Sequence, residues 1–361
     1  MAKTNVGVIF GGVSTEHEVS RWSAVHVLKS LDKSRFSFTI FEITKTGELY
    51  VYTDNGSDIE GLCTELIKVS NEITKKRVFF STELVKEYSL DVIFPVLHGT
   101  GGEDGVLQGM LELSDIPYVG AGVAGSAIAF DKVFTKQILT VMGIKQAAYM
   151  VVTSDDIGND ISEKIKDAEK KLGYPIFIKP ANGGSSVGIY KARDRKSLMD
   201  AVHQAARYDR KVILEEAIKG RELECAVIGG YKGARALGVG EIVPCNEFYD
   251  YEAKYINEGS MVLVPASIAE KIRDEIMEEA VKAFNALDTY GLARVDFFLG
   301  DDGAIYLNEI NTMPGFTRIS MYPKLWRYSG GNDSDLISEL IDLAFERKSK
   351  YKFLKDYAKN E

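Results

Sequence analysis

The feature that most constrains this chain is a pair of apolar runs, 292–299 and 304–310, separated by the turn Gly300-Asp-Asp-Gly. Short runs of this kind, bounded by glycine and aspartate, predict a β-hairpin. Because side chains alternate along a strand, Arg294 and Asp296 share one face of the first run, and Glu309 and Asn311 share one face of the second. Where these two faces coincide, one guanidinium and three oxygen-bearing side chains surround a single point.

That set of side chains suits a magnesium ion. Mg²⁺ prefers hard oxygen ligands, keeps one or two carboxylates, and completes its shell with phosphate and water. An isolated acidic residue is more commonly a solvated surface charge. Here the charges interrupt strongly apolar strands, where an unpaired charge is costly. The hairpin therefore predicts a metal–nucleotide site.

Composition limits the other possibilities. A chain of 361 residues with 45% hydrophobic and 27% charged residues predicts a soluble globular protein of two or three domains. The net charge of −9 argues against a nucleic-acid partner. No apolar run reaches the roughly 20 residues needed to cross a bilayer, and the first ten residues do not resemble a signal peptide. The three cysteines lack metal-ligand spacing, so we expect free thiols and a cytoplasmic location; they are Cys63, Cys225 and Cys245.

Strand and helix signals alternate over the first ~130 residues, which predicts a mostly parallel sheet. Ligands bind beyond the carboxyl ends of such strands. Two glycine-containing segments, 11–18 and 98–105, follow predicted strands and carry the candidate residues Glu16 and His98. Towards the end of the chain we expect a helix over 267–287 and a terminal helix over 335–345, followed by a frayed charged tail.

The middle of the chain contains a candidate phosphate site. A predicted strand ends at Lys179 and leads into the glycine-rich loop 182–188, whose N–H groups could cradle phosphate. The loop is not a Walker A motif, and by itself it would be read as an ordinary surface loop. Lys132 offers a second cation. The segment 212–218 reads as a strand running into a linker that could bind adenine through its backbone, with Glu222 placed for the ribose.

Together these residues resemble the ATP-grasp fold. Four segments, 11–20, 98–109, 248–255 and 311–321, are similar to D-alanine–D-alanine ligases, and the resemblance runs from about residue 5 to 345. It implies an α/β protein of three domains, α+β in its ATP-binding lobes. These would be a Rossmann-like N-terminal domain with a parallel sheet (1–131), a central lobe (132–219), and a C-terminal lobe (220–361) with a lid loop over 244–261.

The resemblance also implies roles for single residues. Glu16 and His98 would bind the first D-alanine, and Arg294 and the Gly315 N–H would stabilise the oxyanion. Ser320 and Met321 would receive the second carboxylate, while Ser185 and Tyr255 would fasten the lid to Glu16. Two Mg²⁺ ions, replaceable by Mn²⁺, would bind Asp296, Glu309 and Asn311. The implied ATP contacts are Lys132, Lys179, Gly184, Ser185, Ser186, Glu215, Glu216, Ile218, Glu222 and Lys254.

The function implied is ATP-dependent ligation of two D-alanine molecules through D-alanyl phosphate, for peptidoglycan precursor synthesis, by a homodimer. Phosphoryl transfer needs metal and cations to spread charge, and an acylphosphate needs protection from water. D-Alanine–D-lactate and D-alanine–D-serine ligases share this fold, and another ATP-grasp carboxylate–amine ligase would share the ATP motifs. A non-catalytic nucleotide sensor would lack metal ligands or the arginine, and all of these are present.

Overall fold

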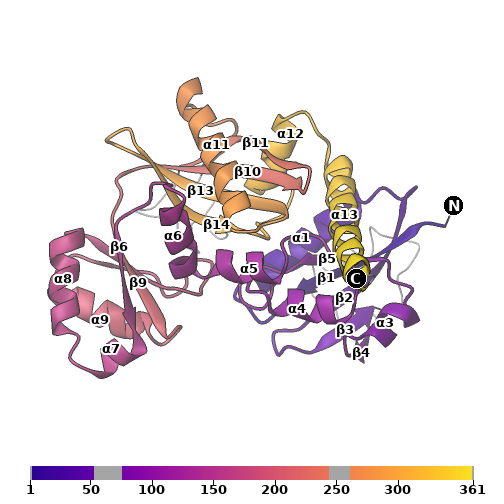
Figure 1. Cartoon of the computed structure of the whole chain (residues 1–361), viewed down its shortest axis with the longest axis horizontal. Helices are drawn as coiled ribbons and strands as arrows, with labels where there is room; N and C mark the ends of the chain where they lie inside the picture. Colours follow the sequence, from indigo (N-terminus) through magenta and orange to yellow (C-terminus); the bar gives the residue numbers. More distant parts are fainter. Residues whose placement is uncertain (1, 53–74, 244–260, 360–361) are drawn as a thin grey trace.

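Three β-sheets organise the chain, and they follow one another in the sequence. The computed structural model describes residues 2–52, 75–243 and 261–359, with side chains as far as residue 350. In Figure 1 the central sheet and its helices lie at the left, the N-terminal sheet lies at the right, and the C-terminal sheet lies above and between them. The candidate site described below lies where the three parts of the chain meet.

The N-terminal sheet has the strand order β4-β3-β2-β1-β5. The parallel centre confirms the predicted α/β class, whereas the outer strands β3 and β4 pair antiparallel. Its strands are β1 (Thr4–Gly11), β2 (Phe36–Ile43), β3 (Leu49–Tyr52), β4 (Lys75–Val78) and β5 (Val92–Val96). Its helices are α1 (His17–Ser30), α3 (Thr82–Glu87) and α4 (Val106–Leu113).

The central sheet, in the order β6-β9-β7-β8, is antiparallel throughout. Helices α5 (Val123–Phe130) and α6 (Lys132–Val141) lead into it. Its strands are β6 (Tyr149–Thr153), β7 (Ile176–Pro180), β8 (Tyr190–Ala192) and β9 (Lys211–Glu216), and its helices are α7 (Ser154–Gly158), α8 (Ser162–Leu172) and α9 (Arg195–Ala205). Apolar side chains of α8 and α9, including Ile165 and Leu198, are buried against this sheet.

The C-terminal sheet has the order β12-β11-β10-β13-β14 and contains the predicted hairpin as the antiparallel pair β13–β14. Its strands are β10 (Gly220–Gly230), β11 (Gly233–Val243), β12 (Met261–Leu263), β13 (Gly291–Gly300) and β14 (Ile305–Asn311). Its helices are α11 (Glu270–Ala286), α12 (Met321–Tyr328) and α13 (Asp333–Lys359). One hydrophobic cluster joins Phe10 and Phe94 of the N-terminal sheet to Phe316 and Tyr322, so these two parts share a core.

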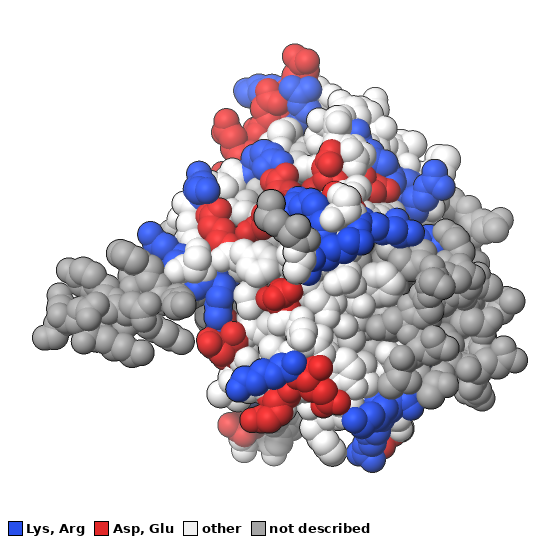
Figure 2. Space-filling view, turned by 90° about the vertical axis from the view of Figure 1, so that its right-hand side faces the viewer, with Lys and Arg blue, Asp and Glu red and all other residues white. Residues whose placement is uncertain are grey.

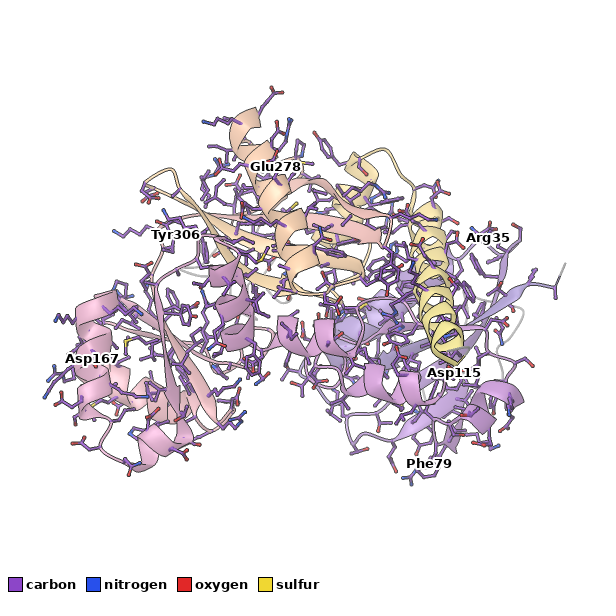
Figure 3. The ribbon with its side chains drawn as sticks, viewed as in Figure 1. Arg35, Phe79, Asp115, Asp167, Glu278 and Tyr306 are labelled. Carbon is purple, nitrogen blue, oxygen red and sulfur yellow. The ribbon has the colours of Figure 1, made fainter. Side chains whose placement is uncertain are left out.

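The terminal helix α13 is longer than predicted, because its charged residues dock onto the N-terminal domain. Arg347 Nη1 donates a 2.6 Å hydrogen bond to the Gly120 carbonyl, and its guanidinium lies 3.9 Å from the centre of the Tyr118 ring. Lys348 Nζ lies 2.6 Å from Asp115 Oδ1, and Asp115 is labelled beside α13 in Figure 3. The expectation that the tail frays after residue 345 is therefore wrong for residues 346–359.

Three predictions concern surface charge, membrane spans and cysteines. On the face shown in Figure 2, acidic and basic side chains lie next to one another. Within the described parts of the chain, none of the helices combines the length and apolar character that a membrane span requires. The Cys225 thiol is buried and free, and Cys63 and Cys245 lie outside the described residues.

Candidate active site

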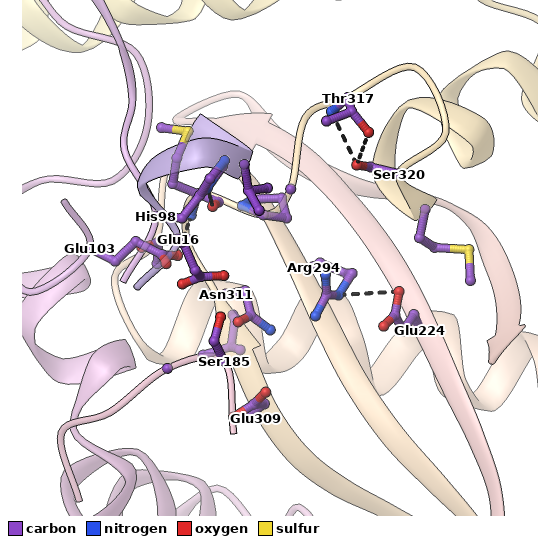
Figure 4. Close-up of a pocket in the computed structure, with 18 of the residues that line it drawn as sticks. Glu16, His98, Glu103, Ser185, Glu224, Arg294, Glu309, Asn311, Thr317 and Ser320 are labelled. Atoms are coloured by element: carbon purple, nitrogen blue, oxygen red, sulfur yellow. Dashed lines mark hydrogen bonds and ion pairs between the residues drawn. The ribbon is translucent and has the colours of Figure 1, made fainter. Parts of the chain in front are cut away.

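A cavity of about 770 Å³ lies where the three parts of the chain meet. Figure 4 shows side chains from loops and strands of all three parts pointing towards it. The predicted site residues in its wall are Glu16, His98, Lys132, Gly184, Ser185, Arg294, Glu309, Asn311, Gly315, Ser320 and Met321. Side chains far apart in the sequence are therefore brought to one space.

The β13–β14 hairpin forms one side of the cavity, and its polar side chains lie on one shared face, as their alternation along the strands predicted. Arg294 lies opposite Asn311, and Asp296 lies opposite Glu309, so the two polar faces coincide. Arg294 Nε and Nη2 donate 2.7 Å hydrogen bonds to the two carboxylate oxygens of Asp296, and Asn311 Nδ2 donates a 3.0 Å bond to Asp296 Oδ2. Burial alone would lower the pKa of Arg294, but Asp296 and Glu224 raise it well above its usual value.

These residues could hold a magnesium ion of the kind whose ligand shell a phosphate completes. No group of three or more His, Cys, Asp or Glu side chains with metal-binding geometry occurs among the described residues. The hairpin instead brings together two carboxylates, Asp296 and Glu309, and the amide of Asn311. A hard-oxygen set with only two carboxylates is what Mg²⁺ uses when a nucleotide supplies further ligands.

The phosphate side begins at the first turn of α6. Asp131 caps this helix by accepting hydrogen bonds of 3.0 and 3.2 Å from the N–H groups of Val133 and Phe134. The cap places Lys132, whose Nζ donates to the Gly183 carbonyl at 2.7 Å and lies 3.7 Å from Glu309 Oε2. Lys132 therefore lies between the glycine-rich loop and the hairpin.

The glycine-rich loop itself is strained. Ser185 and Ser186 have φ values of +49° and +60°, a left-handed conformation that is costly for residues with a Cβ and recurs at functional sites. The Ser185 hydroxyl is buried and has no hydrogen-bond partner among the described residues. A buried hydroxyl in that state is costly, so the loop is suited to a ligand or a neighbouring segment that supplies the partner.

The predicted nucleotide end contains a buried chain of charges. Glu215 lies between Lys136 and Lys179, with a 2.6 Å ion pair to each. Burial raises the pKa of Glu215, but the two lysines outweigh it and bring the value to about 2. The backbone N–H of Glu216 donates to the Ala148 carbonyl at 3.0 Å, and its carboxylate accepts from the Ala148 N–H at 2.7 Å, which anchors the start of the linker.

Several predicted contacts stand behind or beside the cavity wall rather than in it. Among the described residues, these are Lys179, Ser186, Glu215, Glu216, Ile218, Glu222 and Asp296. Asp296 is connected to the wall through Arg294 and Asn311. Burial alone would lower the pKa of Lys179, but Glu215, Glu309 and Glu222 together raise it above its usual value. Tyr255 and Lys254 lie outside the described residues.

The N-terminal side brings together the two glycine-containing segments that follow β1 and β5. Ser14 Oγ donates a 2.7 Å hydrogen bond to the His98 carbonyl, joining the segments. A methyl group at Gly99 would lie 3.0 Å from Glu16 Oε2, and one at Gly184 would lie 3.4 Å from the same oxygen. The Glu16 carboxylate therefore lies against glycines of both the N-terminal domain and the glycine-rich loop.

His98 is almost completely buried and uses both ring nitrogens. Nδ1 donates to the Met313 carbonyl at 2.8 Å, which leaves Nε2 to accept from the Ser23 hydroxyl at 3.1 Å. Burial lowers the pKa of His98 and outweighs the opposing effect of Glu16, so the ring is neutral. In this geometry His98 holds the 312–316 segment in place beside the cavity.

The end of the cavity at α12 is formed by a tight turn. Ser320 Oγ accepts a 3.1 Å hydrogen bond from the Thr317 N–H, and the Ser320 N–H donates to the Thr317 carbonyl at 3.0 Å. The Ser320 N–H expected to bind a substrate carboxylate is thus used within the turn. Met321 begins α12, where backbone N–H groups favour an anion.

Several charged residues of the site were missed by the sequence reasoning, including Arg318 and Lys324 in the cavity wall. Lys136 pairs with Glu215, Glu103 bonds to two loops, and Glu224 lies 3.3 Å from Arg294 Nε. A signal for Glu224 existed, because Glu222 and Glu224 alternate with the buried Leu223 and Cys225 along β10. Glu103 stood within a segment quoted for its resemblance, but nothing local indicated its partners.

The fold and this site together define an ATP-grasp enzyme, with a glycine-rich loop and a polar hairpin facing one cavity. Family models described as D-ala D-ala ligase N-terminus and D-ala D-ala ligase C-terminus match residues 5–121 and 138–342. The chain belongs to the D-alanine–D-alanine ligase family, as the sequence indicated.

Individual relatives support the same assignment. The chain is 48% identical to D-alanine–D-alanine ligase of Ruminiclostridium cellulolyticum, over 96% of each chain. It is 47% identical to the ligase of Clostridium novyi, over 96% of this chain and 100% of the relative. Among solved structures, D-alanine–D-alanine ligase from Coxiella burnetii has a TM-score of 0.86 at 32% identity, covering 99% of both chains. VanG D-Ala:D-Ser ligase from Enterococcus faecalis has a TM-score of 0.84 at 36% identity, covering 95% of this chain and 100% of that one.

Proposed function

We propose that this protein joins two D-alanine molecules into D-alanyl-D-alanine, converting ATP to ADP and phosphate through a D-alanyl phosphate. The observation that carries the proposal is the single cavity that Glu16, the glycine-rich loop and the Arg294 hairpin share. An amino-acid site, a phosphate site and an oxyanion site must be adjacent for a carboxylate to be activated and then attacked. The product would serve peptidoglycan precursor synthesis.

ATP would be held by the cationic and glycine-rich elements on the central side. Lys132 and Lys179 would contact the phosphates, with the backbone of Gly184, Ser185 and Ser186. The segment 215–218 would hold adenine, and Glu222 the ribose. Asp296, Glu309 and Asn311 would hold two Mg²⁺ ions, for which Mn²⁺ may stand in, and the metal would spread the charge of the transferred phosphoryl group.

The first D-alanine would place its ammonium against the Glu16 carboxylate, with its carboxylate turned to the phosphate side. The amine of the second D-alanine would attack the activated carbon, and Arg294 with the Gly315 N–H would stabilise the oxyanion that forms. Arg294 is suited to this role because its Nε and Nη2 are held by Asp296 at 2.7 Å, which fixes the plane of the guanidinium. The end at Ser320 and Met321 would receive the second carboxylate, with Ser185 and Tyr255 fastening the loop 244–261 over both substrates.

We place the protein in the cytoplasm, and we divide the chain into three domains over 1–131, 132–219 and 220–361.

We also propose that it is a homodimer assembled through its N-terminal domain. An apolar face supports the assembly, because Val106 and Leu113 of α4 are 69% and 88% exposed. Exposed apolar side chains on one helix suit a protein interface. Sedimentation equilibrium tests it: a mass of about 80 kDa is twice the 40.0 kDa of the chain, and a monomer at micromolar concentration contradicts it.

A D-alanine–D-serine ligase is the second candidate, because the similarity to VanG reaches 36% identity over nearly the whole chain. The test is to supply Mg-ATP with D-alanine alone, with D-alanine and D-serine, with D-alanine and D-lactate, and with L-alanine, and to identify products by mass. Phosphate release with D-alanine alone and a D-alanyl-D-alanine mass supports the proposal. A predominant mixed product would assign the second candidate or its lactate counterpart.

A further inference from the structure

Glu224 is a buried carboxylate that none of the roles above uses. It lies on β10 directly opposite Asp296 of β13, its side chain is 9% exposed, and it lines the cavity with Arg294, Ser320 and Met321. Its Oε2 is 3.3 Å from Arg294 Nε, the ion pair marked in Figure 4. A charge held in a cavity wall is costly, so it requires an explanation.

We propose that Glu224 is a positioning residue for Arg294 and makes the second-substrate end of the cavity select a zwitterionic amino acid over an anionic hydroxy acid. The inference rests on the proposed function, since it takes Arg294 and the turn before α12 as that end.

The guanidinium of Arg294 is held by two carboxylates, those of Asp296 and Glu224. Asp296 accepts hydrogen bonds of 2.7 Å from Nε and from Nη2 of Arg294. Glu224 lies near the same Nε. Two carboxylates on one edge direct the Nη1 edge towards a ligand in the cavity. An oxyanion donor is effective when its direction is set before the reaction, because no reorganisation is then needed.

The selectivity part follows from charge. Glu224 is an acidic side chain of the cavity wall close to Arg294, and its side chain is largely buried, so its charge interacts with a ligand more strongly than it would in bulk water. Arg318 and Lys324, which also line this end, supply positive charge for a substrate carboxylate. D-Alanine brings an ammonium that balances Glu224, whereas D-lactate brings only a carboxylate, which Glu224 repels.

The test compares Glu224→Gln with a matched control, Glu241→Gln. The Glu241 side chain is also 9% exposed and lies on the neighbouring strand β11, and it accepts hydrogen bonds of 2.7 and 2.6 Å from Arg221. Neither Arg221 nor Glu241 is among the described residues that line the cavity. Both variants thus lose the charge of one buried carboxylate paired with arginine, but only one lies at the cavity.

Each protein receives D-alanine and D-lactate in competition at one pH, and dipeptide and depsipeptide are quantified. For Glu224→Gln we expect the KM for the second D-alanine to rise about tenfold and the depsipeptide share to rise about tenfold, with the KM for ATP unchanged. Glu241→Gln should keep the parent's KM values and product ratio. A Glu224→Gln enzyme with the parent's product ratio and second-substrate KM overturns the inference.

A second variant, Glu224→Asp, keeps the charge but moves the carboxylate, so it separates the effect of charge from that of position. It also tests the inference if the glutamine variant does not fold. Glu224→Asp keeps the negative charge, so it should retain the parent's product ratio within about twofold while kcat falls. A product ratio that shifts as far as expected for Glu224→Gln would overturn the selectivity part. A parent enzyme that forms no D-alanyl-D-alanine would contradict the proposed function itself. The ratio of depsipeptide to dipeptide tests the role of Glu224 only when the parent is active, so the two failures are distinguishable.

Discussion

Glu103 accepts a 2.7 Å hydrogen bond from the backbone N–H of Met313, a residue 210 positions further along the chain. Its other carboxylate oxygen accepts a 2.8 Å bond from the Gly99 N–H. Because His98 also bonds to the Met313 carbonyl at 2.8 Å, the loop after β5 and the segment after β14 are joined at two points. Glu103 therefore holds together two walls of the cavity.

We expect Glu103 to make the stability of the protein depend on pH. Burial and the nearby Glu16 carboxylate raise the pKa of Glu103 to about 8, above its ordinary value of 4.5. The unfolded chain then ionises more readily than the folded one, so this group's contribution to stability falls as the pH rises from about 4.5 to about 8. Glu103→Gln does not titrate, so its stability should lack that decline.

Urea unfolding of both proteins at several pH values between 5 and 8 measures the effect. The free energy of unfolding of the parent minus that of the variant should decrease steadily over this range. Parallel pH profiles would show that Glu103 ionises in the folded state at its ordinary pKa.

Gly99 and Gly101 form a matched pair for testing the place of Glu16. Both have positive φ, +72° and +83°, so alanine at either should cost about 1–2 kcal/mol of stability. A methyl group at Gly99 would lie 3.0 Å from Glu16 Oε2, whereas one at Gly101 has nothing within 4 Å. Gly99→Ala should therefore raise the KM for D-alanine roughly tenfold more than Gly101→Ala, because it displaces Glu16, the proposed partner of the substrate ammonium.

Steady-state kinetics at saturating ATP, with thermal unfolding of both variants, makes this comparison. Equal KM values for D-alanine in two folded variants would mean that Glu16 does not bind the substrate at its observed position.

The hairpin could be predicted from the sequence because its information is local. Alternation places Arg294, Asp296, Glu309 and Asn311 on their faces, and the turn at 300–303 brings those faces together. The glycine-containing segments were placed correctly for the same reason, since each follows a buried parallel strand.

Residues whose partners are distant in the sequence could not be recognised. Glu103 reads as a solvated acid until the chain brings Met313 to it, and Lys136 reads as a surface lysine until Glu215 lies 2.6 Å away. Arg347 reads as part of a charged tail, although the face of Tyr118 covers it. Charge patterns alone do not distinguish solvated groups from groups buried with a partner.

The Lys136–Glu215–Lys179 chain should contribute strongly to stability. Glu215→Gln leaves two lysines facing a neutral amide, and breaking a buried ion pair costs about 3–5 kcal/mol. The two lysines bring the pKa of Glu215 to about 2, below its ordinary 4.5, so the contribution is present above pH 4.5 and is lost as the pH falls towards 2. The stability gap between parent and variant should therefore narrow at acidic pH.

Urea unfolding between pH 3 and 7 checks this, with Glu163→Gln as the control. Glu163 pairs with Lys166 at the same distance of 2.6 Å, but its side chain is 78% exposed, so its loss should have no measurable effect. A gap for Glu215→Gln that stays constant down to pH 3 would contradict a lowered pKa.

Arg294→Ala tests the oxyanion role directly. Loss of one oxyanion donor typically costs ~10² or more in turnover, so kcat should fall at least ~10²-fold. Arg221→Ala is the control, since Arg221 also makes a two-bond pair with a glutamate in this sheet. A folded Arg294→Ala enzyme with turnover near that of Arg221→Ala would mean that another group stabilises the oxyanion.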